Sequence, residues 1–167
     1  MFAQKSANSH RMDDLSIIDY HPDYQADFKR LNVAWISRYF RLESHDLEQL
    51  DDPEHHVLRD GGHILLAKTG SDIVGTVALV QVRPGSWELA KMAVDEAFQG
   101  RQIGKRLGEA AIAWVRQQGG QEIFLESNRR LAPALALYQR LGFEEVPLEE
   151  TPYARADIKM AMSLLSK

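Results

Sequence analysis

The segment from Trp87 to Val115 constrains the fold more than any other part of this sequence. It starts as an apolar run typical of a strand, continues through a loop at 99–105, and ends as a helix. A helix start of this kind directs several unpaired backbone N–H groups to one point, where they and the helix dipole bind an anion. Gly100 and Gly104 leave room for a ligand to approach the backbone closely. The segment therefore predicts a strand, an anion site and a helix in direct succession.

Positive charge and an apolar helix face support this interpretation. Arg101, Lys105 and Arg106 place positive charge at the loop. Apolar residues then recur at helical spacing, at Ile103, Leu107, Ala110, Ala111, Trp114 and Val115. Gly119 and Gly120 are expected to end the helix. The alternative is an ordinary strand-to-helix connection with solvated basic residues, and a short glycine pattern alone does not decide between the two.

Length and composition exclude several classes of protein. The chain has 167 residues, enough for one domain with its own core, and 44% of them are hydrophobic, as in a globular protein. The formal net charge of −4 argues against broad binding to nucleic acid or to an anionic membrane. Without cysteine, the chain has no disulfide, no cysteine-ligated metal and no cysteine nucleophile. No apolar run is long enough to span a membrane, so we expect a cytoplasmic protein.

We expect residues 1–13 to form a polar, poorly ordered tail and residues 14–167 to form one domain. The predicted strands are 15–20, 63–68, 73–82, 87–94, 122–127, 143–146 and 156–165, and the predicted helices are 23–40, 42–50, 103–115 and 132–141. Ser44 is expected to cap the second helix. The order β-α-α-β-β-β-α-β-α-β-β predicts an α+β fold, with a mixed sheet of about seven strands flanked by about four helices.

Two blocks of sequence, one helix apart, resemble the GNAT superfamily of acyl-CoA-dependent N-acetyltransferases. The first is Met92-Ala93-Val94 followed by Gln99-Gly100-Arg101-Gln102-Ile103-Gly104-Lys105, which is similar to the family's pyrophosphate loop, Gln/Arg-x-x-Gly-x-Gly/Ala. The second is Leu125-Glu126-Ser127-Asn128 followed by a helix that ends in Leu137-Tyr138-Gln139-Arg140-Leu141-Gly142-Phe143. It resembles the family's strand–Asn–helix segment, which ends in Leu-Tyr-x-x-x-Gly-Phe. In strand and helix order the resemblance covers roughly residues 15 to 165.

The sequence departs from the family pattern at two places. Gln102 replaces the middle glycine of the loop, and a residue with a side chain works there if its backbone stays in the helical region. The residues Arg129-Arg130-Leu131 place Asn128 further ahead of Tyr138 than in many members. The resemblance implies that Asn128 contacts the cofactor.

The resemblance also implies acetyl-CoA as the co-substrate and no metal. Backbone N–H groups of the loop would bind its phosphates, at Gln99, Gly100, Arg101, Gln102, Ile103, Gly104 and Lys105. The strand edge at Met92 and Val94 would pair with the pantetheine arm, while a backbone N–H of this strand polarises the thioester carbonyl. The side chains of Met92 and Val94 can pack in the core at the same time. His55 and His56 are adjacent, which is expected to set their rings apart, and no third metal ligand follows.

Transfer of an acetyl group to an amine needs a base, because an amine with a pKa of ~10.4 is mostly protonated at neutral pH. Glu88 is the first candidate, since Glu88, Ala90 and Met92 share one face of a regular strand. The alternative is an exposed strand glutamate paired with a neighbouring Lys or Arg. Glu126 is the next candidate base.

The departing thiolate needs a proton. A thiol has a pKa of ~8.5 and a tyrosine ~10, so Tyr138 in the second block is the candidate acid. Its alternative role is that of a core aromatic residue. Further candidates for the wall of the acceptor site are Trp35, Tyr39, Glu43, Asp46, Tyr153 and Arg155, although most of those in the N-terminal helices are expected to be core or capping residues.

The function indicated is acetyl transfer from acetyl-CoA to a primary amine by direct attack in a ternary complex, because the usual acyl-enzyme route needs a cysteine. The acceptor, a small molecule or a peptide amine, stays open. So does the oligomeric state, a homodimer included. The alternative is a non-catalytic acyl-CoA-binding regulatory module on the same fold. A P-loop hydrolase is excluded, since Gly-x-x-x-x-Gly-Lys-Ser/Thr does not occur.

Overall fold

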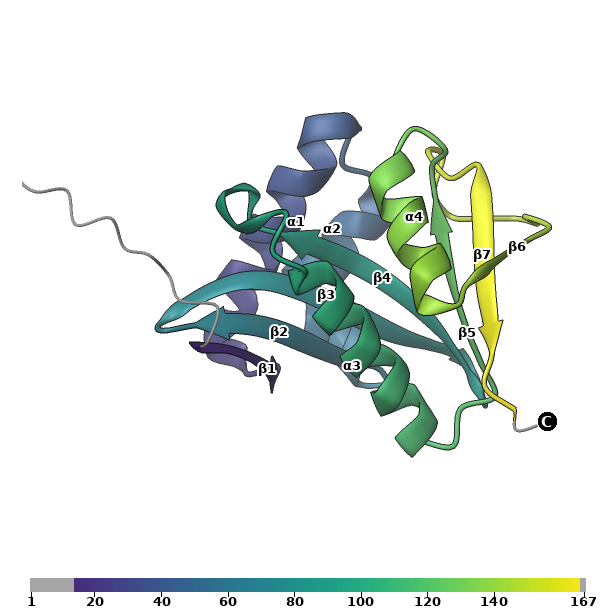
Figure 1. Ribbon diagram of the computed structural model, residues 1–167, viewed down its shortest axis with the longest axis horizontal. Coiled ribbons are helices and arrows are strands. Elements are labelled where there is room, and N and C mark those ends of the chain that lie inside the picture. The colour runs from purple at the N-terminus through teal and green to yellow at the C-terminus, as the bar shows by residue number, and fades with distance from the viewer. Residues whose placement is uncertain (1–13, 166–167) are drawn as a thin grey trace, which may run out of the picture.

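The computed structural model describes residues 14–165, and one mixed sheet of seven strands runs through them in the order β1-β2-β3-β4-β5-β7-β6 (Figure 1). The strands are β1 Leu15–Asp19, β2 His63–Thr69, β3 Asp72–Arg83, β4 Ser86–Val94, β5 Glu122–Ser127, β6 Glu144–Val146 and β7 Ile158–Ser163. The helices are α1 Gln25–Tyr39, α2 Ser44–Asp51, α3 Ile103–Gln117 and α4 Ala132–Leu141. The predicted fold class and the order of strands and helices are confirmed.

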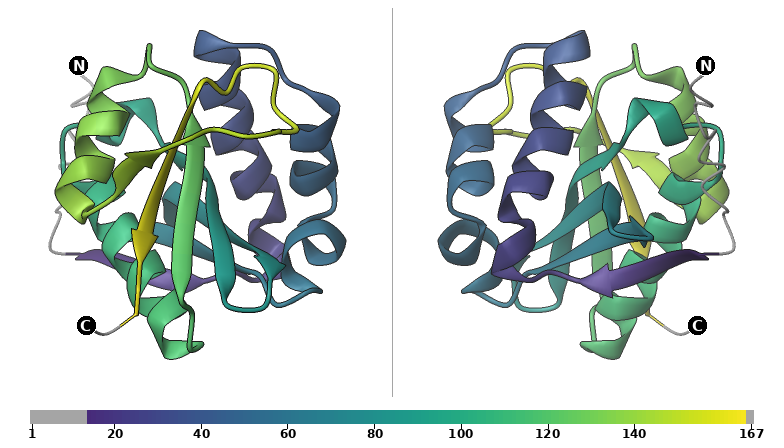
Figure 2. Two further views of the ribbon diagram at one scale, coloured as in Figure 1. Left: turned by 90° about the vertical axis from the view of Figure 1, so that its right-hand side faces the viewer. Right: turned by 90° about the vertical axis from the view of Figure 1, so that its left-hand side faces the viewer.

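Helices cover both faces of the sheet (Figure 2). Helices α1 and α2 lie on one face, called here the α1 face, and α3 and α4 lie on the other, the α3 face. Side chains alternate between the two along each inner strand: Leu65, Leu79 and Leu89 pack on the α3 face, whereas Ile64 and Ala78 pack on the α1 face. Two apolar layers therefore hold the sheet between the helix pairs.

Helix α3 presents the apolar face that its sequence predicts. Ile103, Leu107 and Val115 are buried in the α3-face core. The helix ends at Gln117, and Gly119 follows with φ +76°. A residue with a side chain is strained in that backbone region, which explains why glycine ends the helix here.

The sheet opens between β4 and β5, the only parallel pair of neighbouring strands within residues 14–165. The pairing joins Ser86–Glu88 to Glu122–Phe124 and goes no further. Beyond Glu88, β4 stays paired with β3, while β5 stays paired with β7 along its whole length. The two strands therefore separate, and their facing backbone edges border an opening in the sheet (Figure 1).

The structure corrects the predicted cap of α2. Glu43, and not Ser44, is the N-cap, with extended backbone at φ −104° and ψ 162°. The Glu43 N–H donates to Oδ2 of Asp46 at 2.9 Å, which stabilises the start of the helix one residue earlier than expected. The first predicted helix begins at Gln25, after a 3-10 turn at Pro22–Tyr24.

Two short elements were not predicted, a 3-10 turn at Glu96–Phe98 and a single π turn at Glu54–Leu58. The π turn brings the rings of His55 and His56 to 4.8 Å at an interplanar angle of 71°, so the expectation that they lie apart is wrong. Across residues 14–165, no group of three or more His, Asp or Glu side chains is arranged to hold a metal ion.

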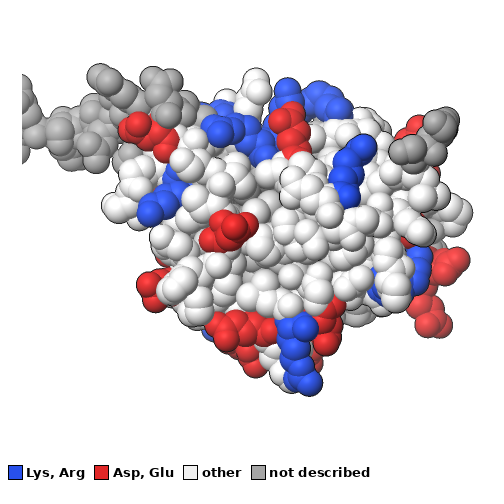
Figure 3. All heavy atoms as spheres, turned by 90° about the horizontal axis from the view of Figure 1, so that it is seen from below, with Lys and Arg blue, Asp and Glu red and all other residues white. Residues whose placement is uncertain are grey.

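The expected tail at 1–13 and the last two residues of the expected domain lie outside the described residues. Within the described part, no helix is long and apolar enough to cross a membrane. Figure 3 shows one face of the molecule, on which acidic and basic side chains of both signs surround a mostly uncharged centre. The expectation that the chain binds no nucleic acid stays a prediction.

Candidate active site

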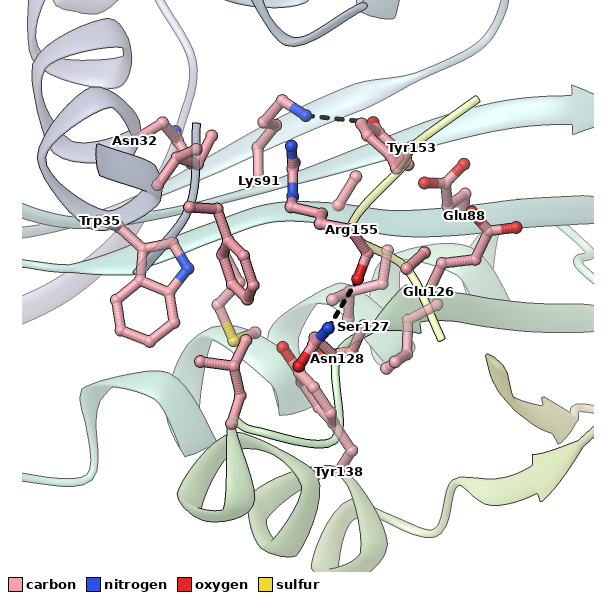
Figure 4. Close-up of a pocket in the computed structure, with 18 residues that line it drawn as sticks. Asn32, Trp35, Glu88, Lys91, Glu126, Ser127, Asn128, Tyr138, Tyr153 and Arg155 are labelled. Atoms are coloured by element: carbon pink, nitrogen blue, oxygen red, sulfur yellow. Dashed lines mark hydrogen bonds between the residues drawn. The ribbon is translucent and has the colours of Figure 1, made fainter. Parts of the chain in front are cut away.

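Two cavities meet where β4 separates from β5. The larger, a cleft of about 910 Å³, lies between β4, the loop at 99–105 and α4. The smaller, a pocket of about 100 Å³, lies between α1, β4, β5 and the connection that precedes β7 (Figure 4). Four residues line both: Trp35, Met92, Leu131 and Tyr138. A ligand in the cleft would therefore reach the mouth of the pocket.

The loop residues predicted to bind a cofactor come together on the cleft. Met92, Val94, Gln99, Gly100, Gln102, Ile103, Gly104 and Lys105 all line it. Arg101 is not among the lining residues, because its guanidinium lies over the Phe98 ring, 5.3 Å from the centroid. The first helical bond of α3 runs from Arg106 N–H to Gln102 O at 3.1 Å. The N–H groups of Ile103, Gly104 and Lys105 therefore precede the hydrogen-bonded turns and are free to meet an anion.

Gln102 does not meet the condition of right-handed helical backbone that the sequence analysis set for a residue with a side chain at this position. Its φ of 61° and ψ of 20° are left-handed, and Gly100, two residues earlier, has φ +79°. The chain comes out of the extended residue Gln99 and must reverse its direction within a few residues to start α3. Left-handed backbone makes this turn, at a cost of about 1–2 kcal/mol for a residue with a side chain.

Two arginines on the cleft were missed by the sequence analysis. Arg130 precedes α4 and Arg140 lies in its last turn, and both line the cleft together with Lys105. The signal for Arg140 is its helical spacing from Pro133 and Leu137, two other lining residues. Three cations therefore line the cleft: Lys105 in the first turn of α3, Arg140 on α4, and Arg130, whose guanidinium lies over the Phe40 ring at 5.5 Å from the centroid.

A bulge interrupts β4 beside the opening. Thr76 pairs with Ala93 and Ala78 with Ala90, so Lys91 and Met92 together face the single residue between Thr76 and Ala78. Lys91 takes φ +50°, which is left-handed. The alternation of side chains therefore shifts by one residue, and Met92 packs against the α3-face core. The expectation that Met92 shares a face with Glu88 is wrong for this reason.

A buried ion network holds the bulge. Asp46 is fully buried and accepts hydrogen bonds from Lys91 Nζ at 2.8 Å and from both terminal nitrogens of Arg155 at 2.7 and 2.8 Å. Glu43 accepts from Arg155 at 2.9 Å, and Lys91 also donates to the Tyr153 hydroxyl at 3.1 Å. Burial alone raises the pKa of Asp46, but the hydrogen bonds from Arg155 and Lys91 hold it well below its usual range. The network ties α2, β4 and the connection before β7 together.

The remaining candidates for the acceptor wall divide between the two cavities. Trp35, Tyr153 and Arg155 line the smaller pocket, and Tyr39 lines the cleft. Glu43 and Asp46 are not among the lining residues and instead bind Arg155 from behind. Glu43 caps α2 and also binds Arg155 of the connection before β7.

Glu88 lines the smaller pocket together with Glu126 (Figure 4). Burial raises the pKa of Glu88 to about 7, and the charge of Glu126 adds to this shift, while Lys91 and Lys159 oppose it. Glu88 has no ion-pair partner within 4.0 Å among residues 14–165. Its carboxylate can therefore take up and release a proton near neutral pH.

Tyr138 lies at the junction of the two cavities. Its ring packs edge-on to Phe143 at a centroid distance of 6.2 Å and against the α3-face core. Burial raises the pKa of Tyr138 to about 12. Its hydroxyl makes no hydrogen bond with any of residues 14–165. A protonated hydroxyl at the meeting point of both cavities is therefore available to a ligand.

Asn128 lines the smaller pocket, and its side-chain amide is engaged within the protein. Nδ2 donates to the carbonyl oxygen of Arg155 at 2.7 Å, and Oδ1 accepts from Arg130 N–H at 2.9 Å. These bonds connect the end of β5 to the connection before β7. A contact between Asn128 and a cofactor stays a prediction.

The sequence model of the acetyltransferase (GNAT) family matches residues 21–143. The chain belongs to the GNAT acetyltransferase family. This segment contains the loop at 99–105, Glu88 and Tyr138, so the resemblance noted on the two sequence blocks is confirmed.

Named relatives of this GNAT chain agree with the family assignment. It is 33% identical to the N-alpha-acetyltransferase RimI of Mycobacterium tuberculosis over 94 residues, which cover 54% of this chain and 58% of that protein. A GNAT acetyltransferase structure from Staphylococcus aureus Mu50 matches with a TM-score of 0.82 at 24% identity, covering 90% of this chain and 99% of the other. A Salmonella typhimurium structure, yncA with its cofactor acetyl-CoA, matches with a TM-score of 0.74 at 17% identity, covering 92% and 95%. At these identities the two structures show the fold.

The ion network predicts how this GNAT chain responds to loss of one carboxylate. Asp46→Ala leaves two buried cations without their shared partner and should lower the free energy of unfolding by about 3–5 kcal/mol at pH 7. Asp51→Ala is the control on the same helix, because Asp51 pairs with Lys29 at an exposed position, where less than about 1 kcal/mol is expected. Since the folded pKa of Asp46 is lowered, its contribution is present above pH ~4 and is lost as the pH falls further. Urea unfolding of both variants measures this, and equal losses would contradict it.

Proposed function

We propose that the chain transfers an acetyl group from acetyl-CoA to a primary amine by direct attack in a ternary complex. The observation that carries this proposal is the junction of the two cavities at Met92 and Tyr138. A cleft that ends at a basic helix start suits the phosphates of an acyl-CoA, and a small pocket with a buried carboxylate suits an amine. Acetyl-CoA in the Salmonella relative and the N-terminal amine named for RimI support both assignments.

The residues of the cleft divide the work of binding acetyl-CoA. The N–H groups at 103–105, with Lys105, fit the phosphates, and Arg130 and Arg140 add positive charge elsewhere on the wall of the cleft. Beyond Glu88, the edge of β4 that faces β5 has no partner strand. The backbone groups on this edge can pair with the amide-bearing pantetheine arm of acetyl-CoA as an added strand would. The bulge at Lys91 turns the backbone at the mouth of the pocket, where an N–H group can polarise the thioester carbonyl.

The proton transfers fall to Glu88 and Tyr138. A Glu88 carboxylate takes a proton from the bound ammonium, whose pKa of ~10.4 lies about 3 units above that of Glu88. The neutral amine attacks the thioester carbon, a C–N bond forms, and the C–S bond breaks. The nitrogen is positively charged after the attack and gives its second proton to solvent, and Glu88 releases the first proton to solvent before the next turnover. Tyr138, protonated at neutral pH, donates to the departing sulfur and recovers its proton from solvent.

Acetyl-CoA should raise the melting temperature of the chain, because a ligand at 100 times its Kd stabilises by about 2.7 kcal/mol. Lys105→Ala removes one cation from the phosphate end and should weaken acetyl-CoA binding about tenfold. Arg116→Ala is the matched control, since it removes the same charge from the last turn of α3. Thermal shift at several acetyl-CoA concentrations measures both. An unshifted parent protein would exclude the cofactor assignment.

Glu88→Gln should lower kcat/KM most at low pH. The parent rate should rise with pH and level off above pH ~7, whereas the variant relies on spontaneously neutral amine and keeps climbing toward the pKa of the amine. Glu144→Gln, an exposed change on β6, is the control and should follow the parent. Parallel pH–rate profiles for the parent and Glu88→Gln would show that another group is the base.

Tyr138→Phe keeps the ring packing and removes only the hydroxyl. Turnover should fall ~10²-fold while the Kd for acetyl-CoA is nearly unchanged, because the hydroxyl acts on the departing sulfur. Tyr24→Phe makes the same chemical change at a hydroxyl that accepts from Lys68 Nζ, away from both cavities, and should not alter turnover. Thiol release from acetyl-CoA measures turnover. A Tyr138→Phe variant that matches the parent would make Tyr138 a core residue only.

A further inference from the structure

The charged groups, the buried polar atoms and the volume of the smaller pocket indicate which amines it can accept. We infer that it selects a primary amine on a short stem without a carboxylate nearby, and that Glu126, beside Glu88, is the residue that rejects anionic acceptors. This inference rests on the proposed acetyl transfer and concerns only the choice of acceptor. It is drawn from the charges, the unpaired acceptor atoms and the size of the pocket.

Glu88 and Glu126 face the pocket from neighbouring strands. Glu88 stands in register with Phe124, and Glu126 follows two residues later on β5, so both project to the α1 face. Figure 4 shows the two carboxylates on the same side of the pocket. Glu126 accepts a hydrogen bond from the Thr151 hydroxyl, which fixes its position. Two carboxylates therefore meet at the point where the amine must lose its proton.

The cations of the pocket are already matched by other carboxylates. Lys91 is paired with Asp46, and Arg155 is paired with both Asp46 and Glu43. Lys159 is the remaining cation that acts on Glu88, and its Nζ lies over the Phe124 ring, 4.6 Å from the centroid. A cationic acceptor would therefore meet two carboxylates in the pocket. An anionic acceptor would meet the same two carboxylates, while the nearest cations are already paired with Asp46 and Glu43.

An unpaired buried oxygen points to the same kind of guest. Asn32 is fully buried and lines the pocket. Its Nδ2 donates to Phe28 O at 2.9 Å, but its Oδ1 has no hydrogen-bond partner in the described part of the chain. A buried carbonyl oxygen without a partner is unfavourable, and an N–H donor from a guest would satisfy it. An ammonium group carries three such donors, and a carboxylate carries none.

The size of the pocket limits the stem of the amine. Its volume of about 100 Å³ holds only a few non-hydrogen atoms, and aromatic rings form part of its wall, among them Trp35, Phe40 and Tyr153. Aromatic faces attract a cation and tolerate a short apolar stem. The remainder of a larger acceptor would have to lie outside the pocket.

β-Alaninamide and β-alanine test this inference, because they have the same shape and differ in one negative charge. The parent should prefer the amide in kcat/KM, and Glu126→Gln should reduce the amide-to-acid ratio about tenfold. The comparison divides the amide-to-acid ratio of the parent by that of Glu126→Gln. The difference between the pKa values of the two amines cancels in this quotient, because it is the same for both enzymes. A change in the pKa of Glu88 cancels as well, because it is the same for both acceptors. Glu126→Gln keeps an oxygen for the Thr151 hydroxyl, so the fold is preserved.

Glu144→Gln serves as the charge control at an exposed position on β6 and should leave the ratio unchanged. Thiol release is measured with each acceptor at saturating acetyl-CoA. Transfer to both acceptors with a ratio that does not respond to Glu126→Gln would overturn the role of Glu126. A parent that prefers β-alanine would overturn the acceptor class. Absence of thiol release with every primary amine, β-alaninamide included, would instead contradict the proposed acetyl transfer, so the two failures are distinguishable.

Discussion

Strands β4 and β5 share parallel hydrogen bonds only as far as Glu88 and Phe124, and the site depends on this early separation. A sheet that opened without compensation would leave unpaired backbone groups inside the protein. Here the bulge at Lys91 redirects β4, and both cavities border the exposed edge. The gap is therefore a place where another extended molecule can complete the pairing. The loop before α3 lies at the end of this edge. The free strand edge and the proposed anion site therefore follow one another along the same cleft.

The opening is held by charge rather than by apolar packing alone. Lys91 is left-handed, and its ammonium reaches Asp46, a residue 45 positions earlier in the chain. Arg155 binds the same carboxylate from the connection before β7. A buried carboxylate shared by two cations is favourable only while both cations stay in place. The network therefore holds α2, β4 and the connection before β7 in fixed positions relative to one another. The pocket consequently has rigid walls on the side away from the cleft.

Local patterns predict the elements of this fold, and long-range contacts decide its details. The apolar period of α3 and the glycines around it are contained in a short stretch of sequence, which is why this helix is predicted correctly. Glu43 caps α2 although glutamate is not a usual N-cap, and its carboxylate is bound by Arg155, 112 residues away. The bulge at Lys91 depends on Asp46 in the same way. Gln102 has no local preference for left-handed backbone, so only the path of the loop explains it.

Burial affects the two proposed proton-transfer residues in the same direction, with different chemical consequences. Each loses solvation, which disfavours the charged form and raises the pKa, to about 7 for Glu88 and about 12 for Tyr138. For a carboxylate, this shift increases basicity without removing the charge above neutral pH. For a tyrosine, it ensures that the hydroxyl keeps its proton at neutral pH and can donate a hydrogen bond to the departing sulfur. Burial thus prepares a base in the smaller pocket and an acid at its junction with the cleft, and the charge of Glu126 strengthens the base further.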